Sequence, residues 1–246
     1  MLPPMIVLFT DFGLSGPYTG QVKAALAQQA PGVPVIDLFA DAPAFDPQLS
    51  AYLLAAYAPA LPLGSVFLCV VDPGVGADRH PLIVEADGRL FVGPDNGLFA
   101  ILARRATTLR VWRIDWRPER LSASFHGRDL FAPVAARLAL GQAVERGALD
   151  PAAIARPDWP DDLARIVYVD VYGNAMTGLR ATTLPYTALL RVGERVARRD
   201  RTFADVPAGA ALWYENSNTL AEIAVNRGRA DRDWGLAVGD RVLVVG

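Results

Sequence analysis

Runs of apolar residues alternate with segments of helical periodicity in the first 71 residues. Residues 5–10, 33–39 and 65–71 are predominantly apolar without strict alternation, which is typical of strands buried on both faces. Residues 18–30 and 46–61 place apolar side chains at helical spacing, and Asp46 followed by Pro47 is typical of a helix start. This strand–helix–strand–helix–strand order predicts an α/β domain with a mainly parallel sheet covered by helices.

The next segment mixes the two periodicities. Residues 81–97 contain two short apolar runs around Asp87 and Gly88, a turn pair that favours a β-hairpin. A helix is predicted over 98–105, a strand over 108–114 and an amphipathic helix over 125–141, ending at Gly141.

The C-terminal third is dominated by short strand patterns. Residues 155–162 hold two prolines and three aspartates and predict a linker. Beyond them, short apolar runs separated by turn residues predict strands within 165–179, 187–193, 211–217, 220–226 and 240–246. We therefore predict an α/β domain over 1–156 and a small all-β barrel or sandwich over 163–246.

Composition sets limits on the class of protein. The chain of 246 residues is 52% hydrophobic and 20% charged, with a formal net charge of −2, which favours an ordinary globular core and no nucleic-acid surface. Cys69 is the only cysteine and lies in an apolar run, so no disulfide is expected within one chain. Residues 1–10 lack the basic start of a signal peptide, and no apolar run is long enough to span a membrane. A cytoplasmic location is expected.

Four polar turns are the main candidates for function in the first domain. They are TDFG (10–13), VDPGVGADR (71–79), GPDNG (93–97) and FHGRD (125–129). Ligands of open α/β sheets bind at the carboxyl ends of strands, so Asp11, Asp72 and Asp95 are predicted to share one rim. A carboxylate in such a place suits the two hydroxyls of a ribose.

Each of these residues also has a structural interpretation. A single Asp after a strand is often a helix N-cap or turn residue, and Asp72 with Arg79 could be a salt bridge that ties a loop. His126 could donate to a neighbouring carbonyl at a helix start. Magnesium at the three aspartates is a further alternative, although the chain shows no phosphate-binding loop, zinc-site spacing or serine-nucleophile motif.

The second domain has two polar interruptions of its apolar strands, YVDVYGNAMT (168–177) and YENSNTLAEIAVN (214–226). Their amides and hydroxyls could bind a base edge or an amino-acid head group, or could simply form turns. These candidates are Asn174, Asn216, Ser217 and Asn218. Three aromatic residues, Tyr172, Trp213 and Tyr214, are expected in the core or at its rim, where one could stack on a purine.

Six of these motifs, in this order and over nearly the whole chain, resemble the S-adenosylmethionine (SAM) hydroxide adenosyltransferases, the water-using relatives of fluorinase and chlorinase. The resemblance implies an N-terminal α/β domain and a C-terminal β-barrel, homotrimers with substrate between subunits, and hydrolysis of SAM to adenosine and L-methionine without a cofactor. It assigns water activation to Asp72, Arg79 and His126.

The resemblance also implies the substrate contacts. Asp11 matches the ribose-binding acid and Asn174 an adenine reader, while the methionine end matches Asp170, Ser217 and Asn218. The chain departs from the family pattern at Gly16, where relatives often have an acid, and at Ala40, where many have a histidine. Asn218 stands where halogenating relatives have an arginine.

Three other functions are alternatives: a SAM-dependent halogenase, an adenosine or SAM sensor without turnover, and a metal-dependent phosphohydrolase. Asp72 favours water over halide, because a carboxylate beside the attack point repels an anion but can accept a proton from water. Arg79 would stabilise developing hydroxide, and His126 would hold the water or relay its proton.

Overall fold

The computed structural model describes residues 4–246, and the chain divides into two compact units between Arg156 and Pro157. Residues 1–3, which belong to the N-terminal segment 1–10 that lacks the features of a signal peptide, lie outside the described residues. Within residues 4–246 no helix is both long and apolar enough to cross a membrane.

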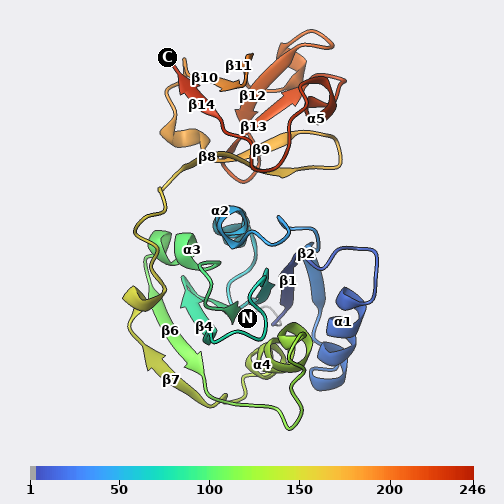
Figure 1. The fold of residues 1–246 in the computed structure, drawn as a ribbon, viewed down its shortest axis with the longest axis vertical. Coiled ribbons are helices and arrows are strands. Elements are labelled where there is room, and N and C mark those ends of the chain that lie inside the picture. Colours follow the sequence, from blue (N-terminus) through green and yellow to red (C-terminus); the bar gives the residue numbers. More distant parts are fainter. Residues whose placement is uncertain (1–3) are drawn as a thin grey trace. The chain divides into compact units, whose positions relative to one another are not determined.

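Unit 1 is a seven-stranded sheet with helices on both faces (Figure 1). The strand order is β2-β1-β3-β5-β4-β6-β7. The strands are β1 (Ile6–Thr10), β2 (Val35–Phe39), β3 (Val66–Val70), β4 (Pro81–Ala86), β5 (Arg89–Pro94), β6 (Leu109–Ile114) and β7 (Arg146–Leu149). The helices are α1 (Tyr18–Gln29), α2 (Pro47–Tyr57), α3 (Ala100–Arg105) and α4 (Ala132–Ala139).

The sheet is mixed, which corrects the prediction of a mainly parallel one. The neighbours β2, β1, β3 and β5 pair in parallel, whereas β4 pairs antiparallel with β5 and β6, and β6 with β7. The predicted hairpin is the reason: its second strand joins β3, so its first strand must run the other way. Its turn residues Asp87 and Gly88 both have positive φ, at 45° and 75°, as a tight hairpin turn requires.

Burial follows the apolar pattern in most of these elements. Every residue of β1 and β3 is buried, because alternate side chains meet helices on opposite faces of the sheet. On one face Ile6, Leu8 and Leu68 pack with α1 and α4. The predicted burial of β2 is wrong, since β2 is an edge strand with Ile36 and Asp37 exposed.

Two helix starts position the site loops. Asp46 caps α2 by accepting from the Leu49 N–H at 2.9 Å, with Pro47 in the first turn, as predicted. The predicted helix at 125–141 is interrupted instead: a π-helical turn, η2 (Gly127–Phe131), precedes α4. Such turns occur often at functional sites, and this one directly follows His126.

Unit 2 is a curled, strand-rich half-barrel of seven strands in the order β14-β10-β11-β12-β13-β9-β8. They are β8 (Leu163–Val169), β9 (Ala175–Arg180), β10 (Leu189–Val192), β11 (Arg195–Arg199), β12 (Ala211–Glu215), β13 (Leu220–Val225) and β14 (Leu243–Val245), with a short helix α5 (Ala230–Asp233). Trp213 is fully buried in its core and donates to the Ala188 carbonyl at 2.8 Å. This confirms the core interpretation of Trp213.

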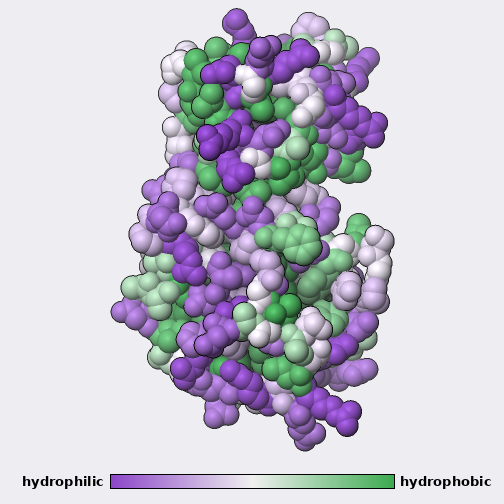
Figure 2. Space-filling view, viewed as in Figure 1, coloured by the Kyte–Doolittle hydropathy of each residue, from purple (hydrophilic) through white to green (hydrophobic). Residues whose placement is uncertain are grey.

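On the face shown in Figure 2, hydrophilic and hydrophobic residues are interspersed in both units.

Candidate active site

The loop after β3 brings Asp72 and Arg79 together in a nearly buried ion pair. Arg79 Nε donates to both carboxylate oxygens of Asp72 at 2.9 Å, and Nη2 also contacts Oδ2. The side chains of Arg79 and Asp72 are only 10% and 3% exposed, respectively. The loop folds tightly between them: Gly76 has φ of 83°, and a Cβ there would lie 2.7 Å from the Ala123 carbonyl oxygen. A glycine is therefore required at this point of the turn.

His126 extends this pair into a network of three side chains. Its Nδ1 lies 3.2 Å from Arg79 Nη2. A guanidinium only donates, so Nδ1 must accept and the ring proton resides on Nε2. Burial lowers the pKa of His126, and the positive charge of Arg79 lowers it further. His126 is thus a neutral imidazole whose Nε2–H can donate.

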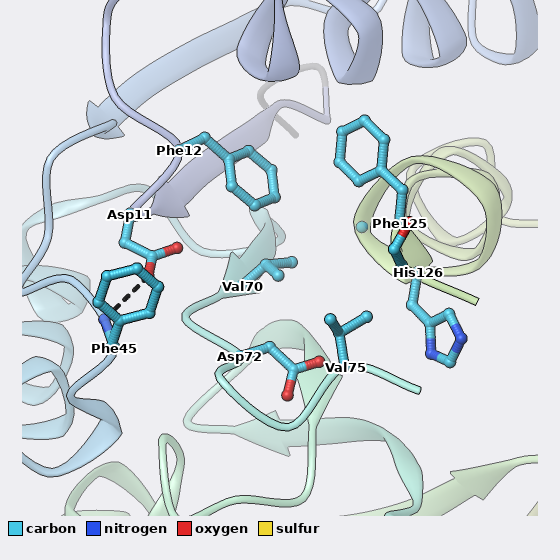
Figure 3. A pocket seen from close by; sticks show the side chains of 10 residues that line it. Asp11, Phe12, Phe45, Val70, Asp72, Val75, Phe125 and His126 are labelled. Atoms are coloured by element: carbon cyan, nitrogen blue, oxygen red, sulfur yellow. Dashed lines mark hydrogen bonds between the residues drawn. The ribbon is translucent and has the colours of Figure 1, made fainter. Parts of the chain in front are cut away.

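Asp11 follows β1 and lines the same cavity as Asp72 and His126 (Figure 3). Its Oδ2 accepts from the Phe45 N–H at 3.1 Å. Burial raises the pKa of Asp11, the Phe45 hydrogen bond opposes that rise, and the charge of Asp72 adds to it. Two carboxylates and a neutral imidazole therefore line one small cavity.

Aromatic rings form much of the remaining wall and were not singled out by the sequence. Phe12, Phe45 and Phe125 line the cavity, and the rings of Phe12 and Phe125 meet edge to face at 5.7 Å. Phe12 and Phe125 belong to the polar turns TDFG and FHGRD, in which only the polar residues were predicted to be functional. Phe45 gives no signal in the sequence, yet it is 78% exposed with φ of 61°. This backbone conformation is uncommon for a bulky residue and places its N–H on Asp11.

Asp95 follows β5, which runs parallel to β3 as β3 does to β1, so the three aspartates follow strand ends on one rim of the sheet as predicted, but Asp95 does not line the cavity. Its carboxylate is paired with Arg156 at 3.3 Å, and its N–H donates to the His80 carbonyl. Among residues 4–246, no group of three or more His, Cys, Asp or Glu side chains is arranged to hold a metal ion.

In unit 2, Asp170 and Asn174 form one compact turn between β8 and β9. Oδ1 of Asp170 accepts from the N–H groups of Tyr172 and Asn174 at 2.9 and 2.8 Å. The Asn174 amide donates to Oδ2 at 3.1 Å. Asn174 is 7% exposed and Tyr172 is 72% exposed. Asp170 and Asn174 therefore have the turn-forming role that was one of their two predicted interpretations.

Ser217 and Asn218 lie in the turn between β12 and β13. Asn218 Nδ2 donates to Ser217 Oγ at 3.1 Å, so the two polar groups are adjacent. Because β13 pairs with β9, this turn and the Asp170 turn belong to neighbouring strands of one sheet. The structure therefore brings Asp11, Asp72, Arg79 and His126 together in unit 1. In unit 2 it leaves Asp170 with Asn174 in one turn and Ser217 with Asn218 in another.

Comparison with solved structures finds the same fold in two proteins. An uncharacterized conserved protein from Thermotoga maritima superposes with a TM-score of 0.84 at 27% identity, covering 98% of this chain and 100% of that one. A conserved hypothetical protein from Thermus thermophilus superposes with a TM-score of 0.76 at 36% identity, with the same coverage.

Sequence comparison finds curated relatives of nearly the same length. The (R)-S-adenosyl-L-methionine hydrolase of Salinispora arenicola is 40% identical over 98% of this chain and 97% of its own. The protein of the same name from Thermus thermophilus is 41% identical over 95% of this chain and 96% of its own.

Two family models match the two units. The SAM hydroxide adenosyltransferase N-terminal domain matches residues 6–147, and the C-terminal domain of that family matches residues 164–243. Both matches agree with the resemblance of the six motifs. The chain therefore belongs to the SAM hydroxide adenosyltransferase family.

Proposed function

We propose that this protein hydrolyses (R)-S-adenosyl-L-methionine to adenosine and L-methionine, by attack of water on the ribose C5′. The observation that carries the proposal is the Asp72–Arg79–His126 network, in which Asp72 and His126 line the cavity of Asp11. The curated relatives bear the name of this activity, including the (R) configuration at sulfur.

The reaction explains why these residue types are needed. The sulfonium leaves as a neutral thioether, so the leaving group needs no acid. Water is a weak nucleophile and must be oriented and deprotonated as the C5′–O bond forms. The oxygen must lie in line with the breaking C5′–S bond, about 3–3.5 Å from the carbon.

The hydrogen bonds among Asp72, Arg79 and His126 indicate a separate role for each of them. The Nδ1 of His126 accepts from Arg79, so its Nε2–H would hold the water oxygen rather than take its proton. The Asp72 carboxylate accepts from Arg79 but, with two oxygens, has further lone pairs to accept a proton from water. Arg79 stabilises negative charge at this point, and its near-burial strengthens the effect. Of the two roles open to His126, this arrangement favours holding the water.

The substrate contacts follow the same chemistry. Asp11 would accept from the ribose hydroxyls, and its burial in the cavity suits a desolvated contact. The amino-acid end of the substrate is a zwitterion, which fits the carboxylate of Asp170 and the donors of Ser217 and Asn218. Asn174 remains the proposed adenine reader, through the parts of its amide that Asp170 does not use.

We propose further that the protein works in the cytoplasm as a homotrimer, with sites at subunit interfaces and no cofactor. The cavity of unit 1 has a volume of about 120 Å³. Pockets for ligands of drug size occupy about 300–1,000 Å³, so this cavity holds only part of such a substrate. The proposed methionine contacts lie in unit 2, which supports a site completed by a second set of residues.

Product analysis tests the function against its alternatives. Each sulfur epimer of SAM is incubated with the protein, with and without a chelator and with and without excess chloride, and the products are separated by liquid chromatography and mass spectrometry. Adenosine and L-methionine from the (R) epimer in every arm is the expected result. Binding without turnover would indicate a sensor, loss with chelator a metal enzyme, and 5′-chloroadenosine a halogenase.

A further inference from the structure

Glu222 is a buried carboxylate that has no place in the reaction described above. It lies on β13, is 2% exposed, and its neighbours across the sheet are Tyr214 on β12 and Met176 on β9. Burial raises the pKa of Glu222; hydrogen bonds from Tyr214 and Asn216 oppose the rise, and the charge of Asp170 adds to it. A buried acid is costly unless its hydrogen bonds are satisfied, so its partners indicate its purpose.

Two donors on the β12 side hold this carboxylate. Tyr214 Oη donates to Oε1 at 2.5 Å, and Asn216 Nδ2 donates to Oε2 at 2.9 Å. The orientation of the Asn216 amide is fixed independently, because its Oδ1 accepts from the backbone N–H groups of Asn218 and Leu220 at 2.9 and 3.0 Å. Backbone N–H groups only donate, so Oδ1 must face them and Nδ2 must face Glu222.

The turn that Asn216 organises is strained. Thr219 has φ of 68°, an outlier for a β-branched residue. Such a conformation persists only where the surroundings enforce it. Here Asn216 bonds the turn through its side chain on both sides of Thr219, and its carbonyl accepts from the Thr219 N–H at 3.0 Å. Glu222 therefore supports, through one amide, the turn that presents Ser217 and Asn218.

On the β9 side Glu222 lies opposite Met176, in the strand that follows the Asp170 turn. There the charge of Asp170 contributes to the raised pKa of Glu222, and the Asn174 amide donates to Asp170 at 3.1 Å. In this antiparallel pair Ile223 lies opposite Ala175 and Leu220 opposite Arg180, so the Asp170 turn and the Ser217 turn lie at opposite ends of the two strands, and it is the Ser217 turn that Glu222 holds through Asn216.

We propose that Glu222 is a positioning residue that, through Asn216, holds the turn that presents Ser217 and Asn218 to the amino-acid end of the substrate. The inference rests on the proposed function, because that function supplies the zwitterion. The inference adds that the affinity of the site for the amino-acid end of the substrate depends on Glu222, which does not contact the substrate.

A partner-exchange cycle tests this role of Glu222. Asn216→Asp keeps an oxygen facing the Asn218 and Leu220 N–H groups but sets a second carboxylate against Glu222. Adding Glu222→Gln restores a donor–acceptor pair of reversed direction, with the Gln amide donating to the new Asp. Glu222→Gln alone can turn its oxygen to Asn216 and its amide to the Tyr214 oxygen, so it should be mild. Asn226→Asp is the matched control, because Asn226 follows the other end of β13 and donates to the Val206 carbonyl, away from the Ser217 turn.

The readouts are KM and kcat for SAM hydrolysis and the Kd for L-methionine by calorimetry, at a pH near 8, with the thermal midpoint of each variant. Asn216→Asp should raise KM and Kd about 10–100-fold with kcat changed less than about threefold, as loss of ground-state binding predicts. Adding Glu222→Gln should return both to within about threefold of wild type. The Asn226→Asp control should lose stability and keep its affinity for L-methionine.

Tyr214→Phe gives a milder form of the same test if Asn216→Asp does not fold. It removes one donor without adding charge and should raise KM about three- to tenfold. Unchanged methionine affinity in the folded variants, or no recovery in the double variant, would overturn the assignment of Glu222 while leaving hydrolysis by the wild type intact. If the wild type neither binds L-methionine nor hydrolyses SAM, the proposed function and this inference both fail.

Discussion

Replacement of Arg79 by methionine should separate the structural from the chemical role of the ion pair with Asp72. The Asp72 carboxylate is 3% exposed and accepts from Arg79 through both oxygens. Arg79→Met therefore leaves a buried charge without its partner, and breaking a buried pair in this way costs about 3–5 kcal/mol. For a chain of this size the thermal midpoint should fall by roughly 6–20 °C, at 2–4 °C per kcal/mol.

Removal of both charges makes the comparison informative. Asp72→Leu combined with Arg79→Met replaces the pair by apolar side chains of similar size, a change that is often neutral or stabilising. The double variant should therefore recover most of the lost stability. Its turnover should stay at least about 100-fold below wild type, because the groups that orient and deprotonate water are gone.

The assay combines thermal unfolding by circular dichroism with adenosine release followed by chromatography. A single variant with the wild-type midpoint would show that the pair is not buried as the structure has it. A stable double variant with wild-type turnover would refute the catalytic role of the network.

Three further predictions concern substrate, protonation and assembly. Asp11→Ala should weaken adenosine binding about 10–150-fold in calorimetry, the loss expected for hydrogen bonds to a charged acceptor, and equal affinity would remove Asp11 from the ribose site. Because burial and Arg79 lower the pKa of His126 from its ordinary 6.5, its neutral form persists above that lowered pKa and activity should be lost as pH falls through it. A pH profile of kcat/KM whose acid limb lies above about 7, or is unchanged in His126→Gln, would contradict this role. Light scattering should give the mass of three chains, whereas an active monomer would exclude sites that need a second subunit.

Local patterns predicted the elements that depend on local chemistry. The Asp46 cap, the Asp87–Gly88 turn and the buried β1 and β3 were all predicted correctly, because capping, positive φ and two-sided burial leave direct marks on sequence. The mixed sheet was not predicted, since the choice of which hairpin strand joins β3 depends on long-range packing. The strands β7 and β11 were missed for a related reason: both are short, and neither is a run of buried apolar residues.

The candidate site was predicted in part. The polar turns pointed to Asp72, Arg79 and His126, and the structure joins these three in one network. Asp95 shares their pattern of a polar residue after a strand, but its carboxylate forms an ion pair with Arg156. Arg156 lies 61 positions further along the chain, so no local pattern predicts this pair. Phe45 was missed because its place in the cavity depends on an unusual backbone angle rather than on its residue type.

The source of the new oxygen tests the central claim most directly. The reaction is run on (R)-S-adenosyl-L-methionine in ¹⁸O-water with chloride or fluoride in large excess, and the nucleoside is analysed by mass spectrometry. Attack of water on C5′ beside the Asp72 carboxylate predicts adenosine with one ¹⁸O at the 5′ position and no more than traces of 5′-haloadenosine. Unlabelled adenosine would show that water does not attack C5′, and 5′-haloadenosine as the main product would show that the site uses halide instead.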